Sequence, residues 1–350
     1  MEDIAFDVIP VIVATGFLGS GKTTLLKRVL SSEAFGDTAV LVNEFGEVGL
    51  DHLLLGEVAP DTVLLSSGCL CCSIRGELSD ALRGLYSRRQ RGEIPAFRRV
   101  VLETTGLADP GPIVSTLLAD PVLKHHFRCG AIVTTVDAVN ALADHVRQPE
   151  WIRQVAVADR LVITKTDLVD DLRLARLEEV LQRLNPAADK ARSDALDEQI
   201  FQGDQGVVRS DSVEEVARWF RPPDLGRAAD YAAPPSGGFG PEVHGSHLSD
   251  VQSFCVILDR EIDWTAFALW LSMLLHCHGN EILRVKGLLN VAGSNTPVAL
   301  HGVQHVIHPP VHLKRWPDDD RRSRIVFITR GIASDTIQPS LETFVDKLAR

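Results

Sequence analysis

The stretch that decides the fold runs from a β-rich segment, Val8-Ile-Pro-Val-Ile-Val-Ala14, into Gly16-Phe-Leu-Gly-Ser-Gly-Lys-Thr23. The second segment fits G-x-x-x-x-G-K-[ST], a pattern that cradles phosphates where a buried strand turns into a helix. Its glycines allow successive N–H groups to face one anion, and the following helix adds the positive end of its dipole. A glycine-rich turn with an exposed lysine is the alternative, but the order of strand, loop and helix favours phosphate binding. We therefore expect a nucleotide to contact Gly16, Gly19, Ser20, Gly21, Lys22, Thr23 and Thr24, with Lys22 on the β- and γ-phosphates and Thr23 on Mg²⁺.

Short apolar runs recur beyond this loop and alternate with helical patterns. They cover residues 39–42, 62–65, 100–102, 131–136 and 161–164, and helical patterns cover 23–31 and 172–184. Nearly all-apolar runs are typical of strands buried on both faces of a parallel sheet. Residues 1–221 are therefore predicted to form an α/β P-loop NTPase domain with a mostly parallel sheet.

The composition changes after residue 221. Five prolines lie within 222–250, which is typical of a linker. Beyond it, residues 254–258, 282–285, 303–307 and 324–328 are predicted strands, and 264–275 and 340–348 are predicted helices. Neighbouring strands indicate a smaller α+β C-terminal domain over 251–350, with a mostly antiparallel sheet.

Two carboxylates end predicted strands of the first domain. Glu103 follows 100–102 and Asp137 follows 131–136. Ligands gather at this edge of an open α/β sheet, so either carboxylate could hold Mg²⁺, although a helix N-cap is the competing role. We favour Glu103 for the metal and leave both roles open for Asp137.

A third motif, Thr164-Lys-Thr-Asp167, follows the predicted strand at 161–164. A carboxylate at Asp167 can accept both the N1–H and the exocyclic N–H of guanine, a pattern that adenine lacks. The stem of Lys165 can cover the base plane. The motif therefore favours GTP.

Three thiols occur together in Gly68-Cys-Leu-Cys-Cys72. Soft thiolates select Zn²⁺, Cu⁺ or iron–sulfur clusters, and the chain offers no second cysteine pair to close a structural zinc site. A water, a partner protein, Glu44, Glu47 or His52 could supply the fourth ligand. A redox-active or merely buried thiol cluster is the alternative, and the remaining cysteines, Cys129, Cys255 and Cys277, are expected to be small buried residues.

The bulk composition limits the function classes. A net charge of −11 argues against non-specific nucleic-acid binding, and no run approaches the ~18 apolar residues of a membrane helix. Acidic residues near Met1 do not suit a signal peptide, so a cytoplasmic protein is expected. Two histidine groups, His244 with His247 and His276-Cys-His278, could bind metal, but ordinary surface histidines are the competing interpretation.

Taken together, these motifs resemble the CobW-type GTPases, P-loop proteins associated with zinc and cobalt delivery. The resemblance covers nearly the whole chain, in order. It rests on the segments Thr15–Thr24, Val42–Asp51, Gly68–Cys72, Glu103–Pro110, Thr164–Asp167 and Arg284–Gly287. Thr164 stands where the family's base motif begins with Asn, and the linker keeps only two histidines.

The resemblance implies GTP hydrolysis coupled to delivery of Zn²⁺ or Co²⁺ to an unidentified client metalloprotein. It implies that Val42–Asp51 senses the γ-phosphate and that the class can form nucleotide-dependent homodimers. It also implies that Cys69, Cys71 and Cys72 are the metal thiolates, and that Cys72, Ser73, Ile74, Arg75 and Gly76 lie near the nucleotide. Two other functions remain open: an ATPase with a redox-sensing thiol cluster, and a non-catalytic nucleotide switch that buffers metal.

Overall fold

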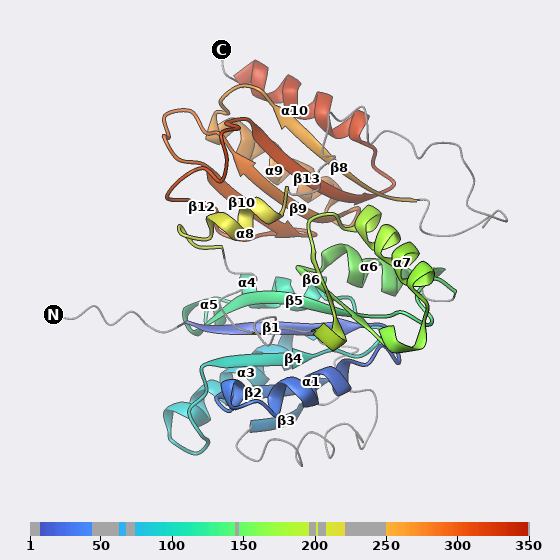
Figure 1. Ribbon diagram of the computed structural model, residues 1–350. Helices are drawn as coiled ribbons and strands as arrows, with labels where there is room; N and C mark the ends of the chain where they lie inside the picture. Colours follow the sequence, from blue (N-terminus) through green and yellow to red (C-terminus); the bar gives the residue numbers. More distant parts are fainter. Residues whose placement is uncertain are drawn as a thin grey trace. The chain divides into compact units, whose positions relative to one another are not determined.

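The structure in Figure 1 is a computed structural model that describes residues 8–43, 63–67, 74–143, 147–195, 201, 208–220 and 250–348. The chain divides into two compact units. The first comprises Met1–His145, Ala158–Ala175 and Lys190–Val207. The second comprises Val146–Val157, Arg176–Asp189 and Val208–Arg350.

A sheet of seven strands forms the centre of the first unit, in the order β3-β2-β4-β1-β5-β6-β7. Six of these strands, from β3 to β6, pair in parallel, which confirms the predicted P-loop NTPase architecture. The strands are β1 (Ile9–Gly16), β2 (Thr38–Asn43), β3 (Val63–Ser67), β4 (Arg99–Glu103), β5 (Phe127–Asp137), β6 (Arg160–Thr164) and β7 (Asp189–Arg192).

Helices follow most of these strands, as parallel crossovers require. In the first unit these are α1 (Lys22–Leu30), α3 (Ile74–Gln90), α4 (Gly111–Ala119) and α5 (Leu123–His126). Of the helices that follow β5, β6 and β7 in sequence, α6 (Pro149–Val157) and α8 (Val213–Arg218) belong to the second unit, and α7 (Asp171–Leu184) is divided between the two. Short 3₁₀ segments among the described residues include η1 (Glu33–Phe35), η3 (Thr166–Leu168) and η4 (Ser193–Ala195). The apolar side of α1, formed by Leu25, Leu26, Val29 and Leu30, packs on Ile12 of β1 and its neighbours in one core.

The position of β1 in the sheet sets the place of the site. It lies between β4 and β5 (Figure 1), and neither neighbour is the next strand along the chain. The loop after β1 therefore lies between the ends of two strands to which it is not directly joined. In register, Ala14 is opposite Glu103, Gly16 is opposite Thr135, and Asp137 is opposite Thr164. Because parallel strands end at the same edge, the predicted phosphate, metal and base motifs share the edge where such sheets bind ligands.

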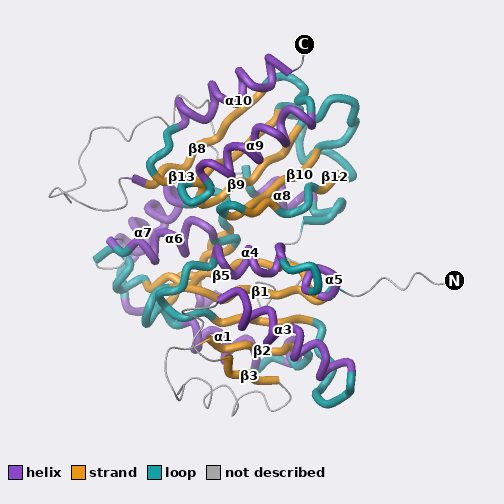
Figure 2. Tube along the Cα trace, turned by 180° about the vertical axis from the view of Figure 1, so that it is seen from behind, coloured by secondary structure: helices purple, strands orange, loops and turns teal. Residues whose placement is uncertain are grey.

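The second unit is built on an antiparallel sheet in the order β11-β10-β9-β13-β8, with β12 also paired to β10. This confirms the predicted α+β architecture. The strands are β8 (Val251–Leu258), β9 (Ile282–Leu289), β10 (Val298–Val303), β11 (Val306–Ile307), β12 (Val311–His312) and β13 (Ser323–Arg330), and the helices are α9 (Trp264–His278) and α10 (Ser334–Leu348). Figure 2 shows α9 and α10 running beside each other over this sheet.

Two apolar clusters cover the two faces of the second sheet. One joins α9 and α10 to Val285 and Leu289 of β9. The other joins Leu288 of the same strand to α8 and Trp219. Adjacent strand residues point to opposite faces, so α8 covers the face away from α9 and α10. The boundaries expected at 221 and 251 stay a prediction, because residues 221–249 lie outside the described part of the chain.

Three local predictions need correction. The strand expected at 303–307 is a hairpin, because Gln304 has a φ of 50° and turns the chain between β10 and β11. The closing helix begins at Ser334 rather than Ser340, with Pro339 inside it. Cys277 is exposed near the end of α9 rather than buried, whereas Cys129 and Cys255 are buried as expected.

Candidate nucleotide-binding site

The loop between β1 and α1 has the backbone of a phosphate cradle. Gly16, Gly19 and Gly21 have φ values of 144°, 69° and 86°, a region that favours glycine. A Cβ atom at Gly16 would lie 2.6 Å from the carbonyl oxygen of Thr135, so a side chain has no room there. The Lys22 ammonium donates to the carbonyl oxygens of Gly16, at 2.7 Å, and Phe17, at 3.2 Å. A cation and a helix N-terminus therefore converge on the loop, as anion binding requires.

Thr23 and Glu103 meet beside this loop, although 80 residues separate them in sequence. The Thr23 hydroxyl donates to Glu103 Oε1 at 2.8 Å, and the Glu103 carboxylate is buried at the end of β4. The N-cap interpretation of Glu103 does not hold, because the next helix, α4, begins at Gly111 with Pro110 as its N-cap. A hydroxyl and a carboxylate at this distance are the hard oxygen ligands that suit Mg²⁺.

Asp137 caps a turn and holds a lysine. Its Oδ1 accepts from the backbone N–H groups of Val139, at 2.8 Å, and Asn140, at 3.3 Å. Its Oδ2 lies 2.7 Å from Lys165 Nζ. These contacts are like those of a helix N-cap, but they close a turn, because residues 138–143 are a turn and the next described helix, α6, begins at Pro149.

The motif Thr164-Lys-Thr-Asp167 splits into a buried and an accessible part. The buried Thr164 hydroxyl donates to the carbonyl oxygens of Ser20, at 2.8 Å, and Val136, at 3.2 Å. Asp167 is exposed in η3, and the Lys165 side chain is 34% exposed. Thr164 thus ties the base motif to the phosphate loop, while Lys165 and Asp167 remain accessible.

A layer of hydroxyl groups supports the phosphate loop, and of its four residues only Ser20 was a predicted site residue. Ser20 Oγ and Thr135 Oγ1 are 2.6 Å apart, and Thr104 donates to Thr15 Oγ1 at 2.8 Å. All four side chains are buried. The available sequence signal was the threonine that ends or follows several of the predicted strands.

Several predicted site residues lie outside the described part of the chain. These are Cys69, Cys71, Cys72 and Ser73, the possible ligands Glu44, Glu47 and His52, and the linker histidines His244 and His247. The described chain ends at Ser67 of β3 and resumes at α3, which begins with Ile74, Arg75 and Gly76. The predicted metal thiolates therefore fall in sequence directly after a strand of the first sheet.

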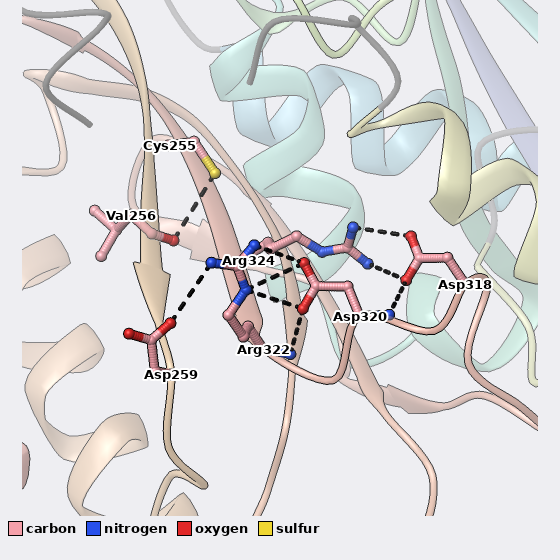
Figure 3. Close-up of polar contacts among 7 residues, drawn as sticks. All are labelled: Cys255, Val256, Asp259, Asp318, Asp320, Arg322 and Arg324. Carbon is pink, nitrogen blue, oxygen red and sulfur yellow. Dashed lines mark hydrogen bonds and ion pairs between the residues drawn. The ribbon is translucent and has the colours of Figure 1, made fainter. Parts of the chain in front are cut away.

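Elsewhere, the described residues offer no group of three or more His, Cys, Asp or Glu side chains that could hold a metal ion. His276 and His278 are exposed near the end of α9, as ordinary surface histidines are. Burial raises the pKa of Cys255 to about 11, and its thiol donates to the carbonyl oxygen of Val256 at 3.8 Å (Figure 3). This thiol stays protonated at neutral pH and is a poor metal ligand. No described helix is long and apolar enough to cross a membrane.

The parallel sheet, the glycine-rich loop and the grouping of Lys22, Thr23 and Glu103 define a P-loop nucleotide-binding protein. The family model for the CobW/HypB/UreG nucleotide-binding domain matches residues 10–192, and that for the cobalamin synthesis protein cobW C-terminal domain matches residues 251–345. The chain belongs to the CobW family, as its motifs indicated.

Named relatives span nearly the whole chain. This chain is 32% identical over 335 residues to the zinc chaperone YjiA of Escherichia coli (strain K12), and the match covers 94% of this chain and 96% of that protein. The crystal structure of Zn(II)-bound YjiA GTPase from E. coli matches with a TM-score of 0.71 at 28% identity, covering 96% and 99% of the two chains. A Zn(II)-bound triple mutant of YjiA, with one glutamate and two cysteines changed to alanine, matches with a TM-score of 0.72 at the same identity and coverage.

Proposed function

We propose that this protein is a GTP-hydrolysing metallochaperone that binds Zn²⁺ or Co²⁺ through Cys69, Cys71 and Cys72 and couples metal delivery to its nucleotide state. Nucleotide binding and hydrolysis are supported by one observation, the grouping of Lys22 with the Thr23–Glu103 pair beside the glycine loop. Full-length similarity to a protein named a zinc chaperone and GTPase carries the choice of GTP and zinc. The chain is accordingly a P-loop GTPase.

The residues have separable tasks in hydrolysis. The loop N–H groups and the Lys22 ammonium would stabilise charge on the phosphates. Thr23 and Glu103 would hold Mg²⁺, which neutralises charge on the β- and γ-phosphates when it is bound. Burial of the Glu103 carboxylate and its hydrogen bond to Thr23 prearrange these oxygens.

The accessible carboxylate of Asp167 supports a guanine base. It is the one carboxylate of the base motif, and the motif is fixed to the phosphate loop through Thr164 and Ser20. One nucleotide could therefore place its phosphates in the loop and its base against Asp167.

The proposed metal site rests on the position of the three cysteines in the sequence. Three thiols follow β3, whose C-terminal end shares the sheet edge with those of β1 and β4. Thiolates bind zinc far better than hydroxyls or thiols do. The triple mutant of YjiA, in which two cysteines are alanine, is Zn(II)-bound, so serine substitution of Cys69, Cys71 and Cys72 is the direct test of the thiolates in this chain.

Hydrolysis of GTP and ATP, each with and without Zn²⁺ or Co²⁺, tests the proposal. Lys22→Ala should abolish turnover and leave the fold intact, because Lys22 acts on phosphate charge rather than on packing. Equal turnover of ATP and GTP would favour the ATPase alternative. The absence of turnover with either nucleotide would favour a non-catalytic switch.

A further inference from the structure

Lys165, which follows β6, has its charged end turned inward. Its ammonium nitrogen lies 2.7 Å from Asp137 Oδ2. The Asp137 side chain is only 1% exposed, whereas that of Lys165 is 34% exposed. Surface lysines usually keep the ammonium in water and lay the stem on protein. Here the ammonium is fixed to a buried carboxylate, while the side chain as a whole remains partly accessible.

Asp137 is itself held firmly. Beside Lys165 it accepts hydrogen bonds from the Asn140 side chain at 2.8 Å and from the backbone N–H groups of Val139 and Asn140. Burial raises the pKa of Asp137, but the hydrogen bonds from Lys165, Asn140 and Val139 outweigh it, so the pKa lies below its usual range. The carboxylate is therefore ionised at neutral pH and forms a fixed anchor.

The backbone at Lys165 reinforces this arrangement. Its φ of 57° is left-handed, a conformation that costs free energy in a non-glycine residue and persists only where the surroundings fix it. The residue before it, Thr164, is bound to the carbonyl oxygen of Ser20. The turn also carries the chain directly into η3, which contains Asp167. The stem of Lys165 and the carboxylate of Asp167 thus lie on one anchored loop.

We propose that Asp137 is a positioning residue for purine recognition, which fixes the Lys165 ammonium so that the lysine stem covers the face of the base while Asp167 reads its edge. This inference rests on the proposed function, since it places a nucleotide at this loop. A stem fixed at both ends has already lost most of its rotamer freedom, so binding costs less entropy. Because the stem contacts a face common to all purines, the effect does not depend on the exocyclic groups of the base.

The test compares the dissociation constants of GDP and IDP for the wild type, Asp137→Asn, Lys165→Met and the double variant. The amide introduced by Asp137→Asn retains an oxygen for the backbone N–H groups but no charge for the ammonium. We expect each single variant to raise both dissociation constants about tenfold, because the freed side chain must then be ordered when the nucleotide binds. The double variant should bind each nucleotide no more weakly than either single variant, because the two substitutions remove the same contact. Asp167→Asn should instead weaken GDP more than IDP, since IDP lacks the exocyclic amine.

Asp120→Asn is the matched control. Asp120 also accepts two backbone N–H groups, from Val122 at 2.9 Å and Leu123 at 3.1 Å, and pairs with a cation, Arg83, at 2.7 Å. It lies before α5, away from the loop, so Asp120→Asn should leave GDP binding unchanged.

Two results would overturn the inference. One is a GDP affinity of Asp137→Asn within twofold of wild type. The other is a double variant whose loss of GDP affinity is the product of the losses in the two single variants. If Asp137→Asn does not fold, Lys165→Met decides alone, because its side chain is partly exposed, and unchanged GDP affinity overturns the inference. If the wild type binds ADP as tightly as GDP, the guanine proposal fails instead. The same comparison made with ADP then tests Asp137.

Discussion

Gly106 follows Glu103 by three residues and packs directly against the phosphate loop. A Cβ atom at Gly106 would lie 2.6 Å from the backbone nitrogen of Leu18 and 2.7 Å from its Cα. Real contacts of this kind are essentially never below 3.0 Å, so Gly106→Ala must displace one of the two backbones by roughly 0.4 Å or more. Backbone atoms cannot swing aside as the end of a flexible side chain can. The displacement therefore falls on the loop that binds phosphate.

The magnitude follows from this contact. Inserting a methyl group into a packed site costs about 1–3 kcal/mol. If the cost falls wholly on nucleotide binding, the dissociation constant for GDP rises by about 5- to 150-fold. If the methyl group instead destabilises the folded protein without nucleotide, that part of the cost should appear as an equal loss in the free energy of unfolding. The loss of binding free energy and the loss of unfolding free energy should together reach about 1–3 kcal/mol.

Fluorescence titration with a labelled GDP and urea unfolding measure the two losses. Gly84→Ala is the control, because Gly84 is exposed in α3 and a Cβ atom there meets nothing within 4 Å. That variant should gain about 0.5–1 kcal/mol of stability and keep its nucleotide affinity. If Gly106→Ala loses less than twofold in GDP affinity and nothing in stability, the packing of this loop is not as described.

Three further predictions test the base motif, the second unit and the linker. Asp167→Asn should weaken GTP binding by about 1.5–3 kcal/mol and leave ATP binding unchanged, and equal losses by calorimetry would refute base reading. His301 is buried against His308, and burial, followed by the charges of His308, Arg284 and Lys286, lowers its pKa well below the usual value. Its protonation is therefore favoured in the unfolded state, so the free energy of unfolding should fall as the pH drops below about 6.5, and His301→Gln should flatten that slope. Native proteolysis should cut within 222–250, and resistance there with cutting elsewhere would move the domain boundary.

The sequence predicted best what depends on local order. The phosphate loop follows from glycine spacing between an apolar run and a helix, and the strands from nearly all-apolar segments. The hydrogen bond from Thr164 to Ser20 could not be predicted, because it joins residues 144 apart and exists only once β6 and the loop share a sheet edge. The same holds for the role of Asp137, which depends on the position of Lys165.

In the second unit, local and tertiary signals conflicted. Residues 303–307 are rich in apolar residues, yet Gln304 turns the chain there. Residues 208–220 precede the proline-rich stretch in sequence, but Trp219 and Val216 complete a core with Leu288 of β9. Composition predicts a linker but carries no information about which sheet a preceding helix covers.

The central claim is that nucleotide state controls metal affinity, and titration of Zn²⁺ and Co²⁺ against a competing chelator tests it most directly. The protein is held first in a non-hydrolysable GTP analogue and then in GDP, with a variant carrying serine at positions 69, 71 and 72 as the reference for the thiolate site. The account predicts a metal affinity that differs between the two states by about 5- to 150-fold, with metal changing nucleotide affinity by the same factor. It also predicts loss of the tight site in the serine variant, because hydroxyls are poor zinc ligands. Equal affinities in the two nucleotide states, or tight binding that survives the serine substitutions, would contradict it.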